Sequence, residues 1–232
     1  FNYTDYFPII SKFFYDNSKD IKLTSCYYCD IYPIGKYSKK KNKERISVDF
    51  DHFFPKEQCP ILALSLRNLI PSCKVCNSRM KGRKDFLKFY EIDGKNKAEQ
   101  KNILRQLSPS SPDYDFRENA MIFVFPKEGF SNKLSFFENM ESYKIHFSSD
   151  KIYTKEINSF FYNQRYNSVS ILGEALSILD LKRNYPISKI HEMKELFKSN
   201  GMLVSENQIE EIIFRKEYDN KIGGPLLLMK ND

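Results

Sequence analysis

With 232 residues, of which 41% are hydrophobic and 15% aromatic, the chain can fold around a core, which excludes an intrinsically disordered protein. No apolar run reaches the roughly 20 residues of a membrane span, and no leader pattern opens the sequence, so we expect a cytoplasmic protein without membrane contact. The net charge of +7 belongs entirely to residues 1–100, which carry 19 Lys and Arg against 12 Asp and Glu, while residues 101–232 carry 18 of each.

The first predicted element is a short helix within residues 1–20. Its apolar side chains are expected to pack on the domain that follows. These side chains are Phe7, Ile9, Ile10, Phe13 and Phe14.

Four of the five cysteines form two Cys-x-x-Cys pairs, Cys26 with Cys29 and Cys73 with Cys76. Each pair places two thiolates on one turn, and two such turns complete the tetrahedral site of a zinc ion. A long insertion separates the pairs, so a substructure must lie between them. The alternatives are two unrelated thiol pairs or a redox pair. Cys59 lacks a partner at a useful spacing and is expected to be a small, buried apolar residue.

Basic residues are dense at two places, in residues 36–45 and just after the second cysteine pair. A basic surface attracts a polyanion because counterions are released on binding. We therefore expect nucleic acid as a partner, with a solvated Lys-rich loop as the alternative. The candidate nucleic-acid contacts are Lys39, Lys40, Lys41, Lys43, Arg79, Lys81, Arg83 and Lys84.

Between the cysteine pairs, residues 46–53 alternate apolar and polar side chains, which is the period of a strand. Residues 68–71 are predicted as a return strand, and residues 77–89 as a helix or two short helices broken near Gly82. The order is strand, loop, strand, helix, with Asp51-His52 near the end of the first strand.

Residues 26 to about 90 resemble the HNH family of ββα-metal endonucleases. The matching residues are Asp51-His52 at the first position, Asn68 at the middle one and Asn77 at the last. The cysteine frame is similar to a zinc-knuckle subgroup in which Asn also follows a Cys-x-x-Cys directly. Many other relatives carry His instead of this Asn.

The resemblance implies metal-dependent phosphodiester hydrolysis. His52 would be the general base, and Asp51 with Asn77 would hold one catalytic Mg²⁺ or Mn²⁺ while the thiolates take the structural zinc. Asn68 would fix the loop between the strands, and Asp49 is a candidate partner of Asp51. DNA is the expected substrate. The alternatives are a nuclease directed at RNA or branched DNA, and a non-catalytic zinc module that binds nucleic acid.

Residues 108–116 are rich in Pro and Ser and predict a linker. We therefore expect an HNH nuclease domain with its N-terminal helix over residues 1–107, and a mainly helical, candidate partner-binding region over residues 108–232. The fold class is α+β, with a zinc-stabilised ββα-metal core and a helical C-terminal extension. The elements predicted for this extension are strands at 121–125 and 144–153, helices at 156–181, 186–199 and 205–218, and an apolar tail at 226–229.

The chain also resembles HNH proteins encoded beside an ATPase gene in bacterial anti-phage operons, such as the nuclease subunit of Septu-type systems. The resemblance rests on residues 51–56 and 68–73, on Asn163-Gln164-Arg165-Tyr166 and on Pro225-Leu226. It implies a defence nuclease that acts with a partner ATPase and has no small-molecule substrate. His146 and His191 lie far from the motif and are expected to be structural or surface residues.

Overall fold

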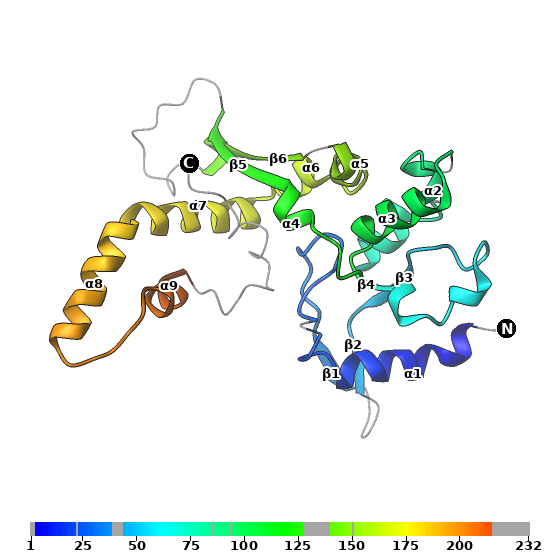
Figure 1. Cartoon of the computed structure of the whole chain (residues 1–232), viewed down its shortest axis with the longest axis horizontal. Helices are drawn as coiled ribbons and strands as arrows, with labels where there is room; N and C mark the ends of the chain where they lie inside the picture. Colours follow the sequence, from blue (N-terminus) through cyan, green and yellow to red (C-terminus); the bar gives the residue numbers. More distant parts are fainter. Residues whose placement is uncertain are drawn as a thin grey trace. The chain divides into compact units, whose positions relative to one another are not determined.

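The structure is a computed structural model that describes residues 3–21, 23–38, 44–84, 86–92, 94–127, 140–149 and 151–214. Contacts divide the chain into a first unit, residues 1–121 with 148–162, and a second unit, residues 122–147 with 163–232. Helices and small two-stranded sheets occur together, which is compatible with the predicted α+β class (Figure 1). The predicted domain division after residue 107 stays a prediction.

The first unit begins with helix α1, Tyr3–Asp16, which packs against the hairpin of β1, Lys36–Ser38, and β2, Glu44–Ile46 (Figure 1). The helix turns Ile10 and Phe14 into a buried apolar core, where the Phe14 ring lies 4.6 Å from the Phe50 ring. Ile9 and Phe13 are exposed, so only part of the predicted apolar face is used for packing. The predicted N-terminal helix is confirmed.

Strands β3, Asp49–His52, and β4, Leu69–Ser72, form an antiparallel pair in which Asp51 lies opposite Ile70. The prediction of one strand over residues 46–53 was wrong. The strand is interrupted after Ile46, because β2 pairs with β1 whereas β3 pairs with β4. The apolar alternation survives this change of partner, and Ile46, Val48 and Phe50 are all buried.

Two short 3₁₀-helices, η1 (Pro60–Leu62) and η2 (Leu66–Asn68), lie in the loop between β3 and β4. After β4, a π-helix, η3, runs over Val75–Lys81 and ends at Gly82, whose φ of +55° suits a residue without a Cβ. The short helix α2, Phe86–Phe89, follows. The predicted break near Gly82 is therefore confirmed.

The first unit is completed by three helices around a cluster of tyrosines and phenylalanines. They are α3, Lys97–Leu107, α4, Phe116–Asn119, and α5, Lys151–Ser159. The Tyr153 hydroxyl donates to the Gln106 carbonyl oxygen at 2.7 Å. Tyr114, in the segment predicted as a linker, donates to Glu156 at 3.0 Å, so this segment is packed into the first unit.

Most of β5, Ala120–Pro126, and β6, Tyr143–Ser149, lies in the second unit, where they form a two-stranded sheet. Three helices follow: α7, Val169–Asn184; α8, Ile187–Ser199; and α9, Glu206–Phe214. Helices α8 and α9 pack against each other (Figure 1). Strand β6 ends before residue 151, where α5 begins, so the predicted strand at 144–153 was too long.

The predicted long helix over residues 156–181 was wrong. The structure divides it into α5, the short α6 at Tyr162–Arg165, and α7. Phe161, between α5 and α6, has a φ of +53°, which no α-helix permits. Beyond it, the Asn167 amide exchanges two hydrogen bonds with the Ile145 backbone, at 2.8 and 2.7 Å, which fixes the turn before α7 to β6.

The predicted helix at 186–199 is confirmed, and the one at 205–218 is confirmed as far as Phe214. Residues 215–218 and the predicted apolar tail lie outside the described residues. Among the helices that the structure describes, none is both long enough and apolar enough to cross a lipid bilayer.

Candidate functional site

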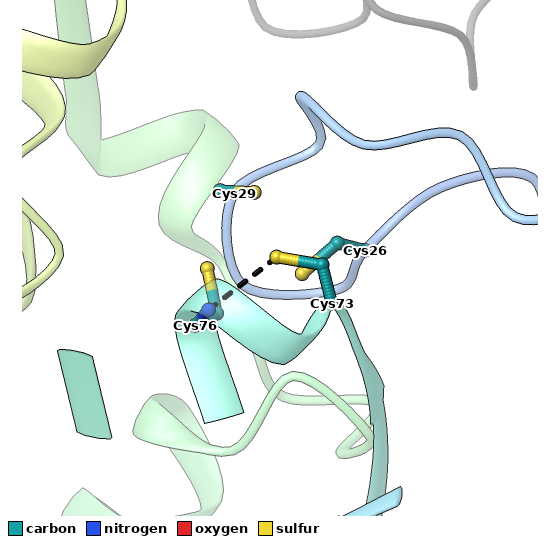
Figure 2. Close-up of side chains that lie close together, drawn as sticks. All are labelled: Cys26, Cys29, Cys73 and Cys76. Carbon is teal, nitrogen blue, oxygen red and sulfur yellow. Dashed lines mark hydrogen bonds between the residues drawn. The ribbon is translucent and has the colours of Figure 1, made fainter. Parts of the chain in front are cut away.

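The four paired cysteines meet in one cluster, although more than 40 positions separate the two pairs (Figure 2). Their sulfur atoms all lie within 4.8 Å of one another. Zinc–thiolate bonds of about 2.3 Å place tetrahedral sulfurs about 3.8 Å apart. The cluster therefore has the ligand type, the number and nearly the spacing that one zinc ion requires.

Backbone contacts hold the two cysteine turns together. The Tyr27 amide donates to the Pro71 carbonyl oxygen at 3.0 Å, which joins the first turn to the strand that leads into the second. Within the second turn, the Cys76 amide lies 3.4 Å from the Cys73 sulfur, the contact drawn as a dashed line in Figure 2. Such N–H donors favour a thiolate over a thiol.

Proximity prevents all four thiols from ionising by themselves. Burial raises the pKa of Cys26, whereas the hydrogen bond from the Cys26 thiol lowers the pKa of Cys73. A divalent cation would remove this conflict because it binds every sulfur as a thiolate.

Asp51 is linked to the first cysteine turn by a hydrogen bond, and each of its two carboxylate oxygens accepts from a different residue. Its Oδ2 accepts a hydrogen bond from the Tyr28 hydroxyl at 2.5 Å, and Tyr28 belongs to the first cysteine turn. Its Oδ1 accepts from the Lys81 ammonium at 2.9 Å. The Asp51 side chain is only 5% exposed. Burial raises the pKa of Asp51, and the charge of Lys81 opposes that rise.

His52, the next residue, is half-buried at the end of β3. Its Nε2 lies 3.0 Å from the Ala63 carbonyl oxygen, which can only accept, so Nε2 carries the proton in the neutral ring. Nδ1 is then the nitrogen with the basic lone pair. Burial lowers the pKa of His52, which keeps the imidazole neutral near pH 7.

Asn68 ties the loop between β3 and β4 to the residues after His52. Its Oδ1 accepts from the Phe54 amide at 2.7 Å, and its Nδ2 donates to the carbonyl oxygens of Phe54 and Leu62, each at 3.1 Å. The side chain is buried. Asn68 thus acts on the loop that contains Ala63, the hydrogen-bond partner of His52.

A pocket of about 630 Å³ opens beside Asp51, His52 and Asn77. Three of the four predicted catalytic residues therefore line one cavity, and Asn68 does not. Asn77 is half-buried at the start of η3. The remaining lining residues are Phe50, Pro55, Lys56, Glu57, Gln58, Lys81, Gly82 and Arg83.

The oxygen donors of this pocket suit a hard divalent cation. A carboxylate from Asp51 and an amide oxygen from Asn77 are ligands that Mg²⁺ and Mn²⁺ accept. Each carboxylate oxygen has a second lone pair beyond the one used by Tyr28 or Lys81. The donor chemistry therefore fits, while a buried ammonium already neutralises the carboxylate.

The predicted nucleic-acid contacts have different surroundings. Arg79 and Arg83 are exposed, and Arg83 lies at the pocket. The half-buried Lys84 has its ammonium 5.3 Å from the centre of the Phe89 ring. Lys81 is buried against Asp51 instead of facing solvent. Residues Lys39, Lys40, Lys41 and Lys43 lie outside the described residues.

Sequence reasoning missed two residues that support this site. Tyr28 contacts Asp51, and its place inside a Cys-x-x-Cys turn was the one available signal. Glu156 is 2% exposed, accepts hydrogen bonds from Tyr114 and Tyr162, and has no partner for Oε2 among the described residues. Tyr162 also donates to the Tyr28 carbonyl oxygen, so Tyr162 links Glu156 to the cysteine turn through hydrogen bonds.

The other residues predicted to be structural do not line the pocket. Cys59 is half-buried at the start of η1 and outside the cysteine cluster. The exposed His191 lies 3.1 Å from Glu206, a contact between α8 and α9. His146 is exposed on β6. The positions of the two histidines agree with the surface role expected for them.

Comparison with known proteins gives a short match. A relative is the Septu protein PtuB of Bacillus thuringiensis, which is 37% identical over 60 residues. The match covers 26% of this chain and 20% of the relative, so it spans about a fifth of the relative's length. No protein-family model matches the chain, and no solved structure matches it significantly. The similarity is therefore weak homology over a short stretch.

Proposed function

We propose that the chain is a metal-dependent HNH endonuclease that hydrolyses phosphodiester bonds of DNA. The observation that supports this most is the shared pocket of Asp51, His52 and Asn77, next to four cysteines that fit one zinc ion. A carboxylate, a neutral imidazole and an amide are the groups that such a reaction needs. A strand pair and a helix carry them in the order expected for a ββα-metal site.

In the proposed reaction, His52 is the general base. With the proton of the neutral ring on Nε2, Nδ1 accepts a proton from a water molecule as the water oxygen bonds to phosphorus. The bond from phosphorus to the 3′ oxygen then breaks, and that oxygen leaves with the electron pair. The Ala63 carbonyl stabilises the imidazolium that results, and Asn68 holds the loop on which Ala63 lies.

Asp51 and Asn77 would hold the Mg²⁺ or Mn²⁺ of the reaction. A bound cation supplies charge stabilisation to the phosphate and to the leaving oxygen. Arg79 and Arg83, both exposed, would bind neighbouring phosphates, which positions the duplex without reading its sequence. Nucleases directed at RNA or branched DNA would use the same chemistry, and we propose DNA as the substrate.

We further propose a cytoplasmic role in anti-phage defence together with a partner ATPase. The similarity to the Septu protein PtuB and the resemblance to nuclease subunits of Septu-type systems support this role. Under this proposal, exposed apolar side chains on the second unit are candidate contacts for the partner. These exposed side chains are Ile187, Leu196, Leu203 and Ile212.

The replacement His52→Ala tests the proposed activity. Supercoiled plasmid is incubated with the chain, alone and with any co-purifying ATPase, in the presence or absence of Mg²⁺ or Mn²⁺. Loss of the general base should slow nicking by about 10²- to 10⁴-fold. The matched control is His191→Ala, an exposed histidine outside the pocket.

Zinc content and circular dichroism of the His52→Ala variant should equal those of the wild type. Full cleavage by this variant would reject the mechanism. A non-catalytic zinc module would instead bind the plasmid and leave it supercoiled under every condition, with either histidine replaced or retained.

A further inference from the structure

Lys81 is buried at the place where a cation would be expected. Its side chain is 3% exposed. Among the lysines and arginines whose burial the structure describes, Lys81 alone is buried. The ammonium nitrogen lies 2.9 Å from Asp51 Oδ1 and 2.5 Å from the His52 carbonyl oxygen. Lys81 thus contacts both residues of the Asp-His step.

The remaining surroundings of Asp51 make this pairing specific. Tyr28 donates to the other carboxylate oxygen at 2.5 Å, so a neutral donor and a charged donor share the group. Burial raises the pKa of the Tyr28 phenol, which keeps it protonated and uncharged. Lys81 is therefore the group that compensates the Asp51 charge, and a buried carboxylate without such a group would be costly.

An ammonium and a divalent cation cannot share this carboxylate without repulsion. Both are attracted to the same oxygens, and a low local dielectric strengthens the repulsion between two positive charges at contact distance. Binding of one therefore weakens binding of the other. This exclusion follows from charge and geometry and does not require any change of protonation.

We propose that Lys81 is an internal cation that competes with the divalent ion for Asp51, so that the ion binds only when the ammonium leaves the carboxylate. The inference rests on the proposed function, since it concerns the cation of that same pocket. Lys81 also lines the pocket, so a displaced ammonium has a polyanion phosphate as an alternative partner. Nucleic acid and the divalent ion then bind with positive coupling, because each favours release of Lys81 from Asp51.

Direct Mn²⁺ binding tests the competition without any cleavage. Zinc-loaded chain lacking DNA is titrated with Mn²⁺, and binding is followed by calorimetry and by the electron paramagnetic resonance signal of free Mn²⁺. Lys81→Met should bind Mn²⁺ at least about tenfold more tightly than the wild type, within the usual range of coupling between two sites. Asp51→Asn should abolish this binding.

The matched control is Lys56→Met, which makes the same chemical change at an exposed lysine of the same pocket. Its Mn²⁺ affinity should stay within about threefold of the wild type, because screening by solvent weakens an exposed charge. Lys81→Gln guards against misfolding, since its amide can still donate to Asp51 without the charge. It should tighten Mn²⁺ binding as Lys81→Met does, with zinc content and circular dichroism unchanged.

The outcomes separate the two levels of the proposal. Equal or weaker Mn²⁺ affinity in both Lys81 variants, with binding that still depends on Asp51, overturns the competition and leaves the cation site in place. Absence of Asp51-dependent binding from every variant overturns the competition and the proposed cation site together. An equal gain in Lys56→Met would also overturn it, since general pocket charge would then explain the effect.

Discussion

The cysteine cluster and the Asp51 pocket are two polar sites built from neighbouring segments, and they are organised in opposite ways. The four sulfurs converge on one another, so one metal ion could bind all four. In the pocket, Asp51 is already neutralised by Lys81 and hydrogen-bonded by Tyr28. We therefore expect the first site to take up a cation from solution, whereas the second already holds the ammonium of Lys81 against its carboxylate.

The two sites differ in how much of their geometry follows from spacing along the chain. A Cys-x-x-Cys spacing fixes the local turn, and the ligand type then determines the ion. An Asp-His step fixes no such geometry, because the partners of the carboxylate come from distant segments. The proposed zinc site consequently depends mainly on two local turns, whereas the proposed Mg²⁺ or Mn²⁺ site depends on contacts between distant segments.

The largest expected effect comes from breaking the cysteine cluster. Cys76→Ser should abolish zinc binding and cooperative folding, since structural zinc contributes about 10–16 kcal/mol in small zinc domains. Metal content measured by mass spectrometry and a circular-dichroism melt check this result. Cys59→Ser, outside the cluster, should retain one zinc ion per chain. A folded, zinc-free Cys76→Ser chain would contradict the structural role.

The second prediction concerns Glu156, which supports the cysteine turn through Tyr162. Burial raises the pKa of Glu156 to about 8 from its ordinary 4.5. Between these values the folded chain keeps a proton that the unfolded chain releases, so stability falls as the pH rises through this window. The loss is at most roughly 5 kcal/mol, from 1.36 kcal/mol per pKa unit.

Glu156→Gln should remove this part of the pH dependence. Urea unfolding at pH 5, 7 and 9 measures it as the difference in unfolding free energy between the variant and the wild type. That difference should favour the variant increasingly toward pH 9. Glu174→Gln, at an exposed position on α7, should parallel the wild type. Parallel curves for Glu156→Gln would show that the carboxyl is ionised in the folded chain.

The smallest expected effect connects the two sites. Tyr28→Phe removes one hydroxyl, and with it the hydrogen bond from the cysteine turn to Asp51. Plasmid cleavage should fall by about tenfold, as for other groups that orient a metal ligand. Tyr27→Phe is the matched control, because its hydroxyl donates to the Ile21 carbonyl oxygen. Zinc content should stay at the wild-type value in both, and equal activities would mean that Tyr28 does not orient Asp51.

Local patterns predicted the elements whose structure depends on neighbours in sequence. The N-terminal helix, the return strand at β4 and the break at Gly82 follow from apolar period and from backbone freedom. The long helix at 156–181 failed because its apolar period continues through Phe161, while the break depends on backbone geometry and on contacts with a distant strand.

The candidate site divides in the same way. The cysteines could be grouped from their spacing, and they lie together. The burial of Lys81 could not be predicted, because its partner Asp51 is 30 positions away and the surrounding residues are basic and exposed. A run of basic residues predicts an exposed surface. The burial of one of its lysines can be predicted only when the carboxylate that pairs with that lysine is known.

The π-helical pitch of η3 has a consequence for how the two sites are joined. Its two buried side chains are Cys76 and Lys81, five positions apart. In an α-helix, five positions turn through about 500°, which would direct the two side chains roughly 140° apart. A π-helix, with its i→i+5 hydrogen bonds, has more residues per turn, so the same five positions leave the two side chains closer to one face. Removal of one residue between them would leave the two side chains four positions apart. In an α-helix four positions turn through about 400°, so the ordinary pitch would also direct both to one face. The π-helical pitch thus compensates for one additional residue between Cys76 and Lys81.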